Sequence, residues 1–367
     1  MEGFELDYDR RLENMIARRT APVETMTKSV RYGQATIVEN QYYKASPVFE
    51  VYNKLSKEGS AIRYTVGAMA RIDPNYTKIT YEQGDRVKNQ LDRALRDINA
   101  TCDFEYQGSV TNDTHIKSYS DIDLLAITQR FWTLEPPQQP SYPYEGNPHD
   151  DLLEIRSTSC DCLTAAFPKA EVDSSGAKSI SISGGSLSRK IDIVPANWYN
   201  TNRYAQIQAK RFRAIQVLDL KLGERVKNMP FLHNYRIMKR NERTNGGLCK
   251  VIRLMKSLKY DSDSISLSSY DLAAIGYNMP EPQLMTLPGG EISLLARLKT
   301  YLDGLKANPS LCTEMLVPDE SRKIFAAGHA TRQELDNLRD EVDDLVEAVS
   351  HNLQKSFTKL AEARLTY

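Results

Sequence analysis

The sequence predicts an α+β fold, in which a mixed β-sheet with helices is followed by a helical C-terminal lobe. At 367 residues the chain is long for one hydrophobic core and suits two closely packed lobes. Strand patterns gather before residue 200: residues 121–127 are apolar like a buried strand, and residues 180–186 alternate polar with apolar side chains. From about 230 to 325 the apolar spacing is helical instead.

Composition and charge describe an ordinary soluble protein. Hydrophobic residues make up 41% of the chain and charged residues 26%. Lys+Arg and Asp+Glu are equal at 48 each, so the chain has no overall basic field for nucleic acid. Any affinity for a polyanion must therefore be local.

The cysteines and the N-terminal residues indicate the cellular compartment of the protein. The five cysteines include no Cys-x-x-Cys pair, which argues against a disulfide framework or a structural zinc site and suits a reducing cytosol. The first residues lack the basic and apolar regions of a signal peptide, and no apolar run of about 18 residues occurs. We therefore expect a cytoplasmic protein that does not span a membrane.

The segment before the candidate site contains no candidate catalytic residues and is predicted to have a structural role. Residues 1 to about 45 predict a peripheral helix and loop, because their apolar positions are sparse. Apolar residues then recur at helical spacing from Pro47 until a break at Gly59-Ser60. Residues 81–96 predict a long amphipathic helix that leads into a strand at 104–106.

The first part of the candidate site lies between residues 107 and 127. Asp121 and Asp123 are two residues apart in a predicted strand, so both carboxylates point to one face. Two such charges repel each other unless a cation lies between them, and oxygen ligands select a hard ion such as Mg²⁺. Upstream, Gly108-Ser109 predicts a turn that opens into a short helix and directs N–H groups at phosphate. A triphosphate then fits between the turn and the metal.

A third carboxylate completes the pattern. A site with two metal ions about 3.5–4 Å apart needs one more ligand for the ion that activates the attacking hydroxyl. Asp192 supplies it on a strand whose Ile191 and Ile193 face the opposite way, towards a core. The alternative is that the three aspartates only cap helices or form salt bridges. Burying isolated carboxylates in apolar strands without an ion would cost folding free energy. The triad Asp121, Asp123 and Asp192 thus predicts nucleotidyl transfer, with all three as metal ligands.

Several motifs together resemble one known family: Gly108-Ser109, Thr114-His115-Ile116, Ser120-Asp121-Ile122-Asp123, Lys190-Ile191-Asp192-Ile193-Val194-Pro195 and, more weakly, segments at 243–247, 253–259 and 317–325. Over residues 50 to 328 the chain looks like the bacterial cGAS/DncV-like nucleotidyltransferases of the polymerase-beta superfamily. The resemblance implies a polymerase-beta-like core, two Mg²⁺ ions with Mn²⁺ as a substitute, and nucleoside triphosphate substrates that include ATP. It also implies a cyclic di- or trinucleotide product in anti-phage (CBASS-type) signalling, and a downstream effector that binds it.

With this resemblance the chain divides into four parts. Residues 1–45 are the peripheral segment, and 46–200 are the catalytic core, whose helix near 80–97 becomes the spine between the lobes. Residues 201–328 are a helical lobe that completes the nucleotide pocket, and 329–367 are a C-terminal amphipathic helix.

One helix of the second lobe has a basic face. In residues 249–260 one side is apolar, while Arg253, Lys256 and Tyr260 fall together on another. A solvated face is the ordinary explanation. The resemblance instead implies that Lys256 grips the donor triphosphate, with Lys259 and Arg253 as weaker candidates, so the nucleotide-binding set is Gly108, Ser109 and Lys256.

Three other features are left open or are interpreted as structural. The proline-rich segment near 136–148 is a surface loop or a flap over the nucleotide. The apolar seam between Leu335 and Leu360 either packs along its own protein or contacts a regulatory partner or a second copy. His115 has no paired ligand, so it is interpreted as an ordinary polar histidine.

Two other functions compete with the synthesis of a cyclic signal. One is nucleotide addition to RNA or protein. The absence of net basic charge argues against a long RNA as the acceptor. The other is a catalytically inactive nucleotide-binding module, against which the intact triad argues. The His/Cys cluster of the animal DNA sensor in this superfamily is absent from the sequence, so zinc-assisted duplex sensing is not expected.

Overall fold

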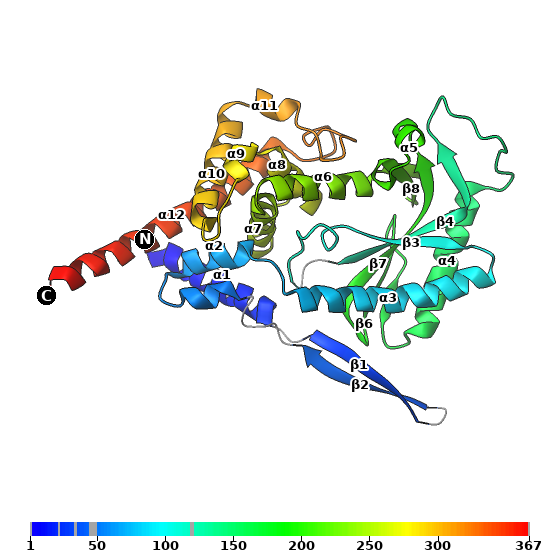
Figure 1. The fold of residues 1–367 in the computed structure, drawn as a ribbon, viewed down its shortest axis with the longest axis horizontal. Coiled ribbons are helices and arrows are strands. Elements are labelled where there is room, and N and C mark those ends of the chain that lie inside the picture. Colours follow the sequence, from blue (N-terminus) through cyan, green and yellow to red (C-terminus); the bar gives the residue numbers. More distant parts are fainter. Residues whose placement is uncertain (1, 21–22, 33–34, 44–49, 118–120, 366–367) are drawn as a thin grey trace.

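The structure is a computed structural model that describes residues 2–20, 23–32, 35–43, 50–117 and 121–365. One half of the molecule is a β-sheet with two long helices against it, and the other half is a bundle of helices (Figure 1). This confirms the α+β class. Within the described ranges, no helix combines the length and the apolar character that a bilayer-spanning segment needs.

The sheet is mixed, with the strand order β3-β4-β7-β6-β5, and β8 and β9 extend it from β7. Its strands are β3 (Cys102–Gln107), β4 (Ile122–Leu134), β5 (Glu171–Asp173), β6 (Ile180–Gly184), β7 (Leu187–Asn200), β8 (Arg213–Asp219) and β9 (Glu224–Asn228). β4 and β7 run parallel, while the other neighbouring strands of this sheet run antiparallel. The predicted turn at Gly184 joins β6 to β7 as an antiparallel hairpin.

The two faces of the sheet differ in what covers them. On β4, Ile122 and Leu124 face α3 (Pro74–Asp97) and α4 (Pro148–Ala166) and share a buried cluster with Val87 and Leu152. Leu125, one residue out of phase, belongs to the buried cluster of the other face. Side chains alternate along a strand. Asp123, in phase with Leu125, therefore lies on the face away from α3 and α4.

The spine helix α3 begins earlier than the sequence suggests. Asp73 caps its start by accepting a hydrogen bond from the N–H of Asn75, and Pro74 occupies the first turn, where its missing N–H costs nothing. Val87 and Leu95 are buried against the sheet, as the amphipathic pattern predicts.

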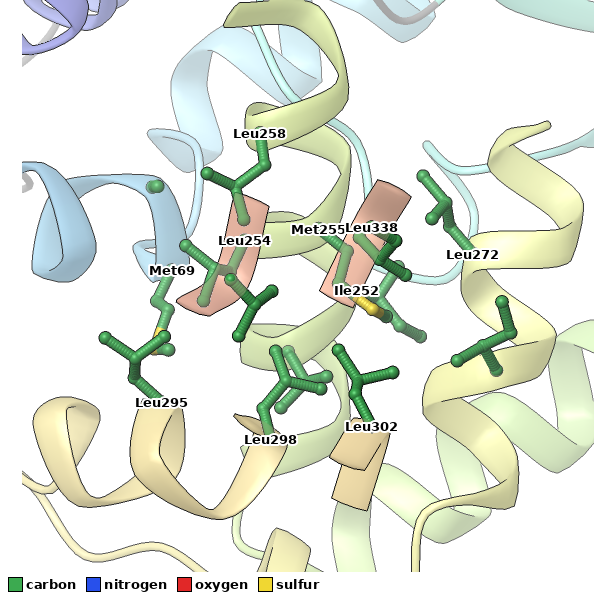
Figure 2. Close-up of a cluster of buried hydrophobic side chains, with 14 of the residues drawn as sticks. Met69, Ile252, Leu254, Met255, Leu258, Leu272, Leu295, Leu298, Leu302 and Leu338 are labelled. Carbon is green, nitrogen blue, oxygen red and sulfur yellow. The ribbon is translucent and has the colours of Figure 1, made fainter. Parts of the chain in front are cut away.

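The helical half is built around α7 (Gly247–Asp261). It also contains α6 (Pro230–Arg243), α8 (Ser269–Asn278), α9 (Glu281–Leu284), α10 (Glu291–Ala307) and α11 (Ser310–Thr313). Figure 2 shows Leu254 and Leu258 of α7 among side chains from α2 (Ser60–Met69), α10 and α12 (Arg332–Leu365). The described part of α7 is buried almost along its whole length, so its position is fixed by apolar packing.

The N-terminal segment differs from the predicted peripheral helix and loop. α1 (Glu2–Thr20) places Tyr8, Leu12 and Met15 in the same core as α7, because these residues recur at helical spacing on one face. In place of a loop, β1 (Val23–Tyr32) and β2 (Ala35–Tyr43) form an antiparallel hairpin that projects from the body (Figure 1). Both α1 and α2 thus pack with the helical half although they precede the sheet in sequence.

The remaining short elements are η2 (Val51–Leu55), α5 (Asn202–Ile207) and η3 (Lys210–Phe212). The proline-rich segment follows β4 and is tied to the far end of the sheet, where Gln138 donates a hydrogen bond to the Asn200 carbonyl at 3.1 Å. Asp123 lies at the other end of β4, roughly 35 Å away along the strand at about 3.3 Å per residue. The surface-loop interpretation is therefore favoured over a flap.

The C-terminal helix α12 is buried on one face as far as Asn352, and residues 353–358 are exposed. Leu335, Leu338, Val342, Leu345 and Val349 are buried in the helical core. Farther on, Leu353 is 37% and Phe357 is 71% exposed, and the helix extends beyond the body (Figure 1). The side chain of Leu360 lies outside the described residues. The apolar seam thus packs along its own protein up to about Val349.

We predict that Leu345→Ala destabilises the fold, whereas Phe357→Ala on the same helix does not. Removing a buried leucine side chain costs about 2–5 kcal/mol of unfolding free energy, and an exposed one costs little. Thermal melting at two protein concentrations distinguishes packing from assembly: the Leu345→Ala loss should not depend on concentration. A melting temperature of the unaltered protein that falls with dilution, together with a lower mass of Phe357→Ala in light scattering, would instead identify this end of α12 as an interface.

Candidate active site

The register of three strands brings the predicted carboxylates into one row across the sheet. Asp123 of β4 is paired with Gln107 of β3 on one side and with Asp192 of β7 on the other. Both aspartates lie on the face away from α3 and α4. The structure thus places Asp123 and Asp192 side by side, with Asp121 one residue before β4.

Gly108 follows Gln107 directly and so lies against Asp123. Its backbone has φ +79°, and a Cβ added there would collide with Oδ2 of Asp123. Glycine is the residue that accepts both the left-handed conformation and the close approach. The predicted glycine turn is therefore present, with its backbone beside the carboxylates.

The segment after Gly108 is a series of turns, not the short helix that the sequence suggests. Thr111 donates hydrogen bonds to the Gly108 carbonyl from its N–H at 3.2 Å and from its hydroxyl at 2.7 Å. Thr114 N–H donates to the Ser109 carbonyl at 3.1 Å. Backbone donors near Ser109 can still bind an anion, but the dipole of a helix does not contribute. Residues 118–120, including the Ser120 of the predicted motif, lie outside the described residues.

Helices of the other half hold this loop in place. Asn234 on α6 accepts a hydrogen bond from Asn112 at 2.9 Å and donates one to Thr111 at 2.6 Å. Arg253 on α7 is buried and donates to the Asp113 carbonyl. The sequence gives no signal for Asn234, and it suggests only a weak phosphate role for Arg253.

Lys256 lies beneath the same loop. Its side chain is buried, and its Nζ donates to the Thr114 carbonyl at 3.1 Å. Burial lowers the pKa of Lys256 to about 8, although the nearby Asp123 carboxylate favours its charged form. The lysine therefore lies within electrostatic reach of the triad, as a nucleotide-binding role requires. Lys259, one turn farther along α7, donates to the Leu267 carbonyl instead.

The carboxylates affect one another's protonation. Burial, followed by the charges of Asp192 and Asp121, raises the pKa of Asp123 to about 7. Burial likewise raises the pKa of Asp192, although the Lys190 ammonium beside it acts in the opposite direction. Such a cluster of like charges is stabilised by any cation that enters it.

Lys190 is the cation that contacts the cluster. Its Nζ lies 3.5 Å from Asp121 Oδ2 and 3.2 Å from Asp192 Oδ1. The position of Lys190 two residues before Asp192 on β7 puts both side chains on one face, a local signal that sequence reasoning missed.

A divalent cation fits this site by its chemistry. Asp123 and Asp192 lie side by side on β4 and β7, Asp121 directly precedes β4, and the raised pKa values of Asp123 and Asp192 mark a demand for positive charge. Among the described residues, however, no three acidic, histidine or cysteine side chains lie close enough to one another to bind a single metal ion together. Lys190 supplies the positive charge between the carboxylates in this arrangement.

His115 is structural, as the sequence predicts. It is buried, and its Nε2 lies 3.0 Å from the hydroxyl of Thr77 on α3. Burial lowers the pKa of His115 to about 4, so the imidazole is neutral near pH 7. It ties the loop to the spine helix through this contact with Thr77.

Comparison with known proteins identifies the family, although no protein-family model matches the sequence. A cyclic dinucleotide synthase CdnE from Yersinia aleksiciae is 35% identical over an alignment that covers 93% of this chain and 92% of that protein. A c-di-GMP synthase from Capnocytophaga granulosa is 32% identical and covers 76% of this chain and 84% of its own.

The fold agrees with these relatives. The solved structure of a STING-associated CdnE c-di-GMP synthase from Capnocytophaga granulosa matches with a TM-score of 0.70 at 26% identity, covering 95% of this chain and 99% of the other. Identity above 30% across nearly the full length shows common descent. The predicted resemblance is confirmed: this chain belongs to the bacterial cGAS/DncV-like nucleotidyltransferases, the family of cyclic oligonucleotide synthases.

Proposed function

We propose that this enzyme joins two molecules of GTP into a cyclic dinucleotide signal. The observation that carries the proposal is the direct pairing of Asp123 with Asp192 beside the Gly108 turn, in a chain whose relatives include proteins named c-di-GMP synthases. The family resemblance by itself implies ATP as a substrate. The names of the relatives favour GTP.

The metal ligands in this proposal are Asp121, Asp123 and Asp192. The expected loading is two Mg²⁺ ions, with Mn²⁺ as a substitute. When bound, the ions neutralise charge on the transferring phosphate and lower the pKa of the acceptor hydroxyl.

The chain's own residues bind and orient the reactants. The backbone at Gly108 and Ser109 holds the donor phosphates, because glycine puts no side chain between this turn and Asp123. Lys256 adds a positive charge from beneath the loop. Asp192 orients the acceptor ribose hydroxyl and accepts its proton.

The reaction occurs twice. In each step the ribose hydroxyl oxygen of one nucleotide bonds to the α-phosphorus of the other, and the bond from that phosphorus to pyrophosphate breaks. The second step joins the two ends, so the product has no terminal phosphate. We further propose that the signal acts on a STING-type effector, by analogy with the relative named STING-associated, in the reducing cytoplasm that five free cysteines suit.

We predict that GTP alone, incubated with the protein and Mg²⁺, gives a product that survives phosphatase and has the mass of two GMP less two waters. Phosphatase followed by mass spectrometry is the measurement, and single nucleotides and all pairs of ATP, GTP, CTP and UTP are compared under Mg²⁺ and Mn²⁺.

The other outcomes have separate meanings. A resistant product that requires ATP would correct the base choice and keep the reaction. Label found only on added tRNA or protein, with no resistant small molecule under either metal, would contradict cyclic synthesis and support nucleotide addition to a macromolecule.

We also predict that Lys256→Met weakens binding of a non-hydrolysable GTP analogue roughly 10- to 150-fold, because a charge-assisted contact contributes about 1.5–3 kcal/mol. Isothermal titration calorimetry measures the affinity, and thermal melting reports whether the variant is folded. Lys259→Met on the same helix is the control and should bind normally. Unchanged affinity in Lys256→Met would restrict this lysine to supporting the loop at Thr114.

A further inference from the structure

Lys190 lies between two carboxylates of the triad by virtue of strand register. Ile122 of β4 is paired with Ile191 of β7, so the residues that precede this pair, Asp121 and Lys190, are also neighbours. The Lys190 ammonium lies 3.5 Å from Asp121 Oδ2 and reaches both oxygens of Asp192, at 3.2 and 3.3 Å. One side chain thus bridges two of the three proposed metal ligands.

The bridge occupies the place where a metal would have to bind. A divalent ion contacts carboxylate oxygens directly, at about 2.0–2.1 Å for Mg²⁺. The same oxygens of Asp121 and Asp192 face the ammonium. An ion and the ammonium carry like charges, so both cannot lie between these carboxylates without strong repulsion.

The side chain of Lys190, unlike that of Lys256, can move away from the carboxylates. Lys256 is buried under the loop and fixed by its hydrogen bond to the Thr114 carbonyl. The side chain of Lys190 is 43% exposed, and the Asp121 side chain that it contacts is 46% exposed. A long flexible chain at the surface can swing into solvent or towards a newly bound anion.

We propose that Lys190 is a built-in counter-ion that occupies the carboxylate cluster in the nucleotide-free protein and is displaced when a metal enters with a triphosphate. This positioning role rests on the proposed metal site. It lets the strands hold three carboxylates together in the absence of metal, and it weakens the binding of metal alone.

The order of binding follows from charge. A metal that arrives alone must separate the ammonium from both carboxylates and leaves it only the more distant Asp173 as an anionic neighbour. A metal that arrives with a triphosphate brings phosphate oxygens to which the displaced ammonium can pair. Lys190 therefore couples metal loading to the presence of substrate.

The test compares Mn²⁺ binding by Lys190→Met and by the unaltered protein, followed by electron paramagnetic resonance of free Mn²⁺. Without nucleotide, Lys190→Met should bind Mn²⁺ roughly tenfold more tightly, which corresponds to about 1.4 kcal/mol. With a non-hydrolysable GTP analogue present, the gain should shrink or reverse. Lys190→Arg keeps the charge and should resemble the unaltered protein.

Lys299→Met is the matched control, because Lys299 also bridges two aspartates, Asp303 at 2.7 Å and Asp343 at 3.0 Å, in the helical half. It should leave Mn²⁺ affinity unchanged. Equal or weaker Mn²⁺ binding by folded Lys190→Met without nucleotide would overturn the counter-ion role while leaving the metal site intact. No Mn²⁺ bound by any of these proteins, even with the GTP analogue, would overturn the metal site and this role together.

Discussion

The parallel pairing of β4 with β7 is the constraint on which the site depends. It places Asp123 directly beside Asp192, on a face where burial raises the pKa of both carboxyls. A one-residue slip of either strand would turn its carboxylate to the opposite face and expose its apolar partners. The buried clusters on the two faces of the sheet therefore enforce the register that crowds these charges. Positive charge is then required, and in this structure Lys190 supplies it.

The second half of the molecule matters to the site through one loop. The turns after Gly108 are held by hydrogen bonds from Asn234, Arg253 and Lys256, which belong to α6 and α7. Since α7 is fixed by apolar packing on most sides, the position of this loop is fixed with it. Both the backbone proposed to bind phosphate and the carboxylates thus come from one half, while the contacts that hold the loop come from the other. In the proposed reaction, such an arrangement places the reactants with little reorganisation of the loop.

The sequence predicts the features that depend on local periodicity. Alternation along β4 and β7 puts Asp123 and Asp192 opposite their apolar neighbours, and the same rule predicts the stripe of α3. Features that depend on tertiary contacts are predicted poorly. The short helix expected after Gly108 is replaced by turns whose carbonyls are bound by distant helices. The Lys190 bridge to Asp121 requires the register of two strands, which no single segment reveals. The packing of α1 was open to prediction, since Tyr8, Leu12 and Met15 lie at helical spacing.

Anomalous scattering from crystals grown with Mn²⁺ and a non-hydrolysable GTP analogue tests the central claim most directly, because it locates the metal without relying on turnover. The account predicts anomalous peaks within about 2.0–2.3 Å of carboxylate oxygens of Asp121, Asp123 and Asp192, with the Lys190 ammonium moved out from between them. Analogue bound beside Gly108 with no peak at these carboxylates, and with Lys190 still bridging Asp121 and Asp192, would contradict it.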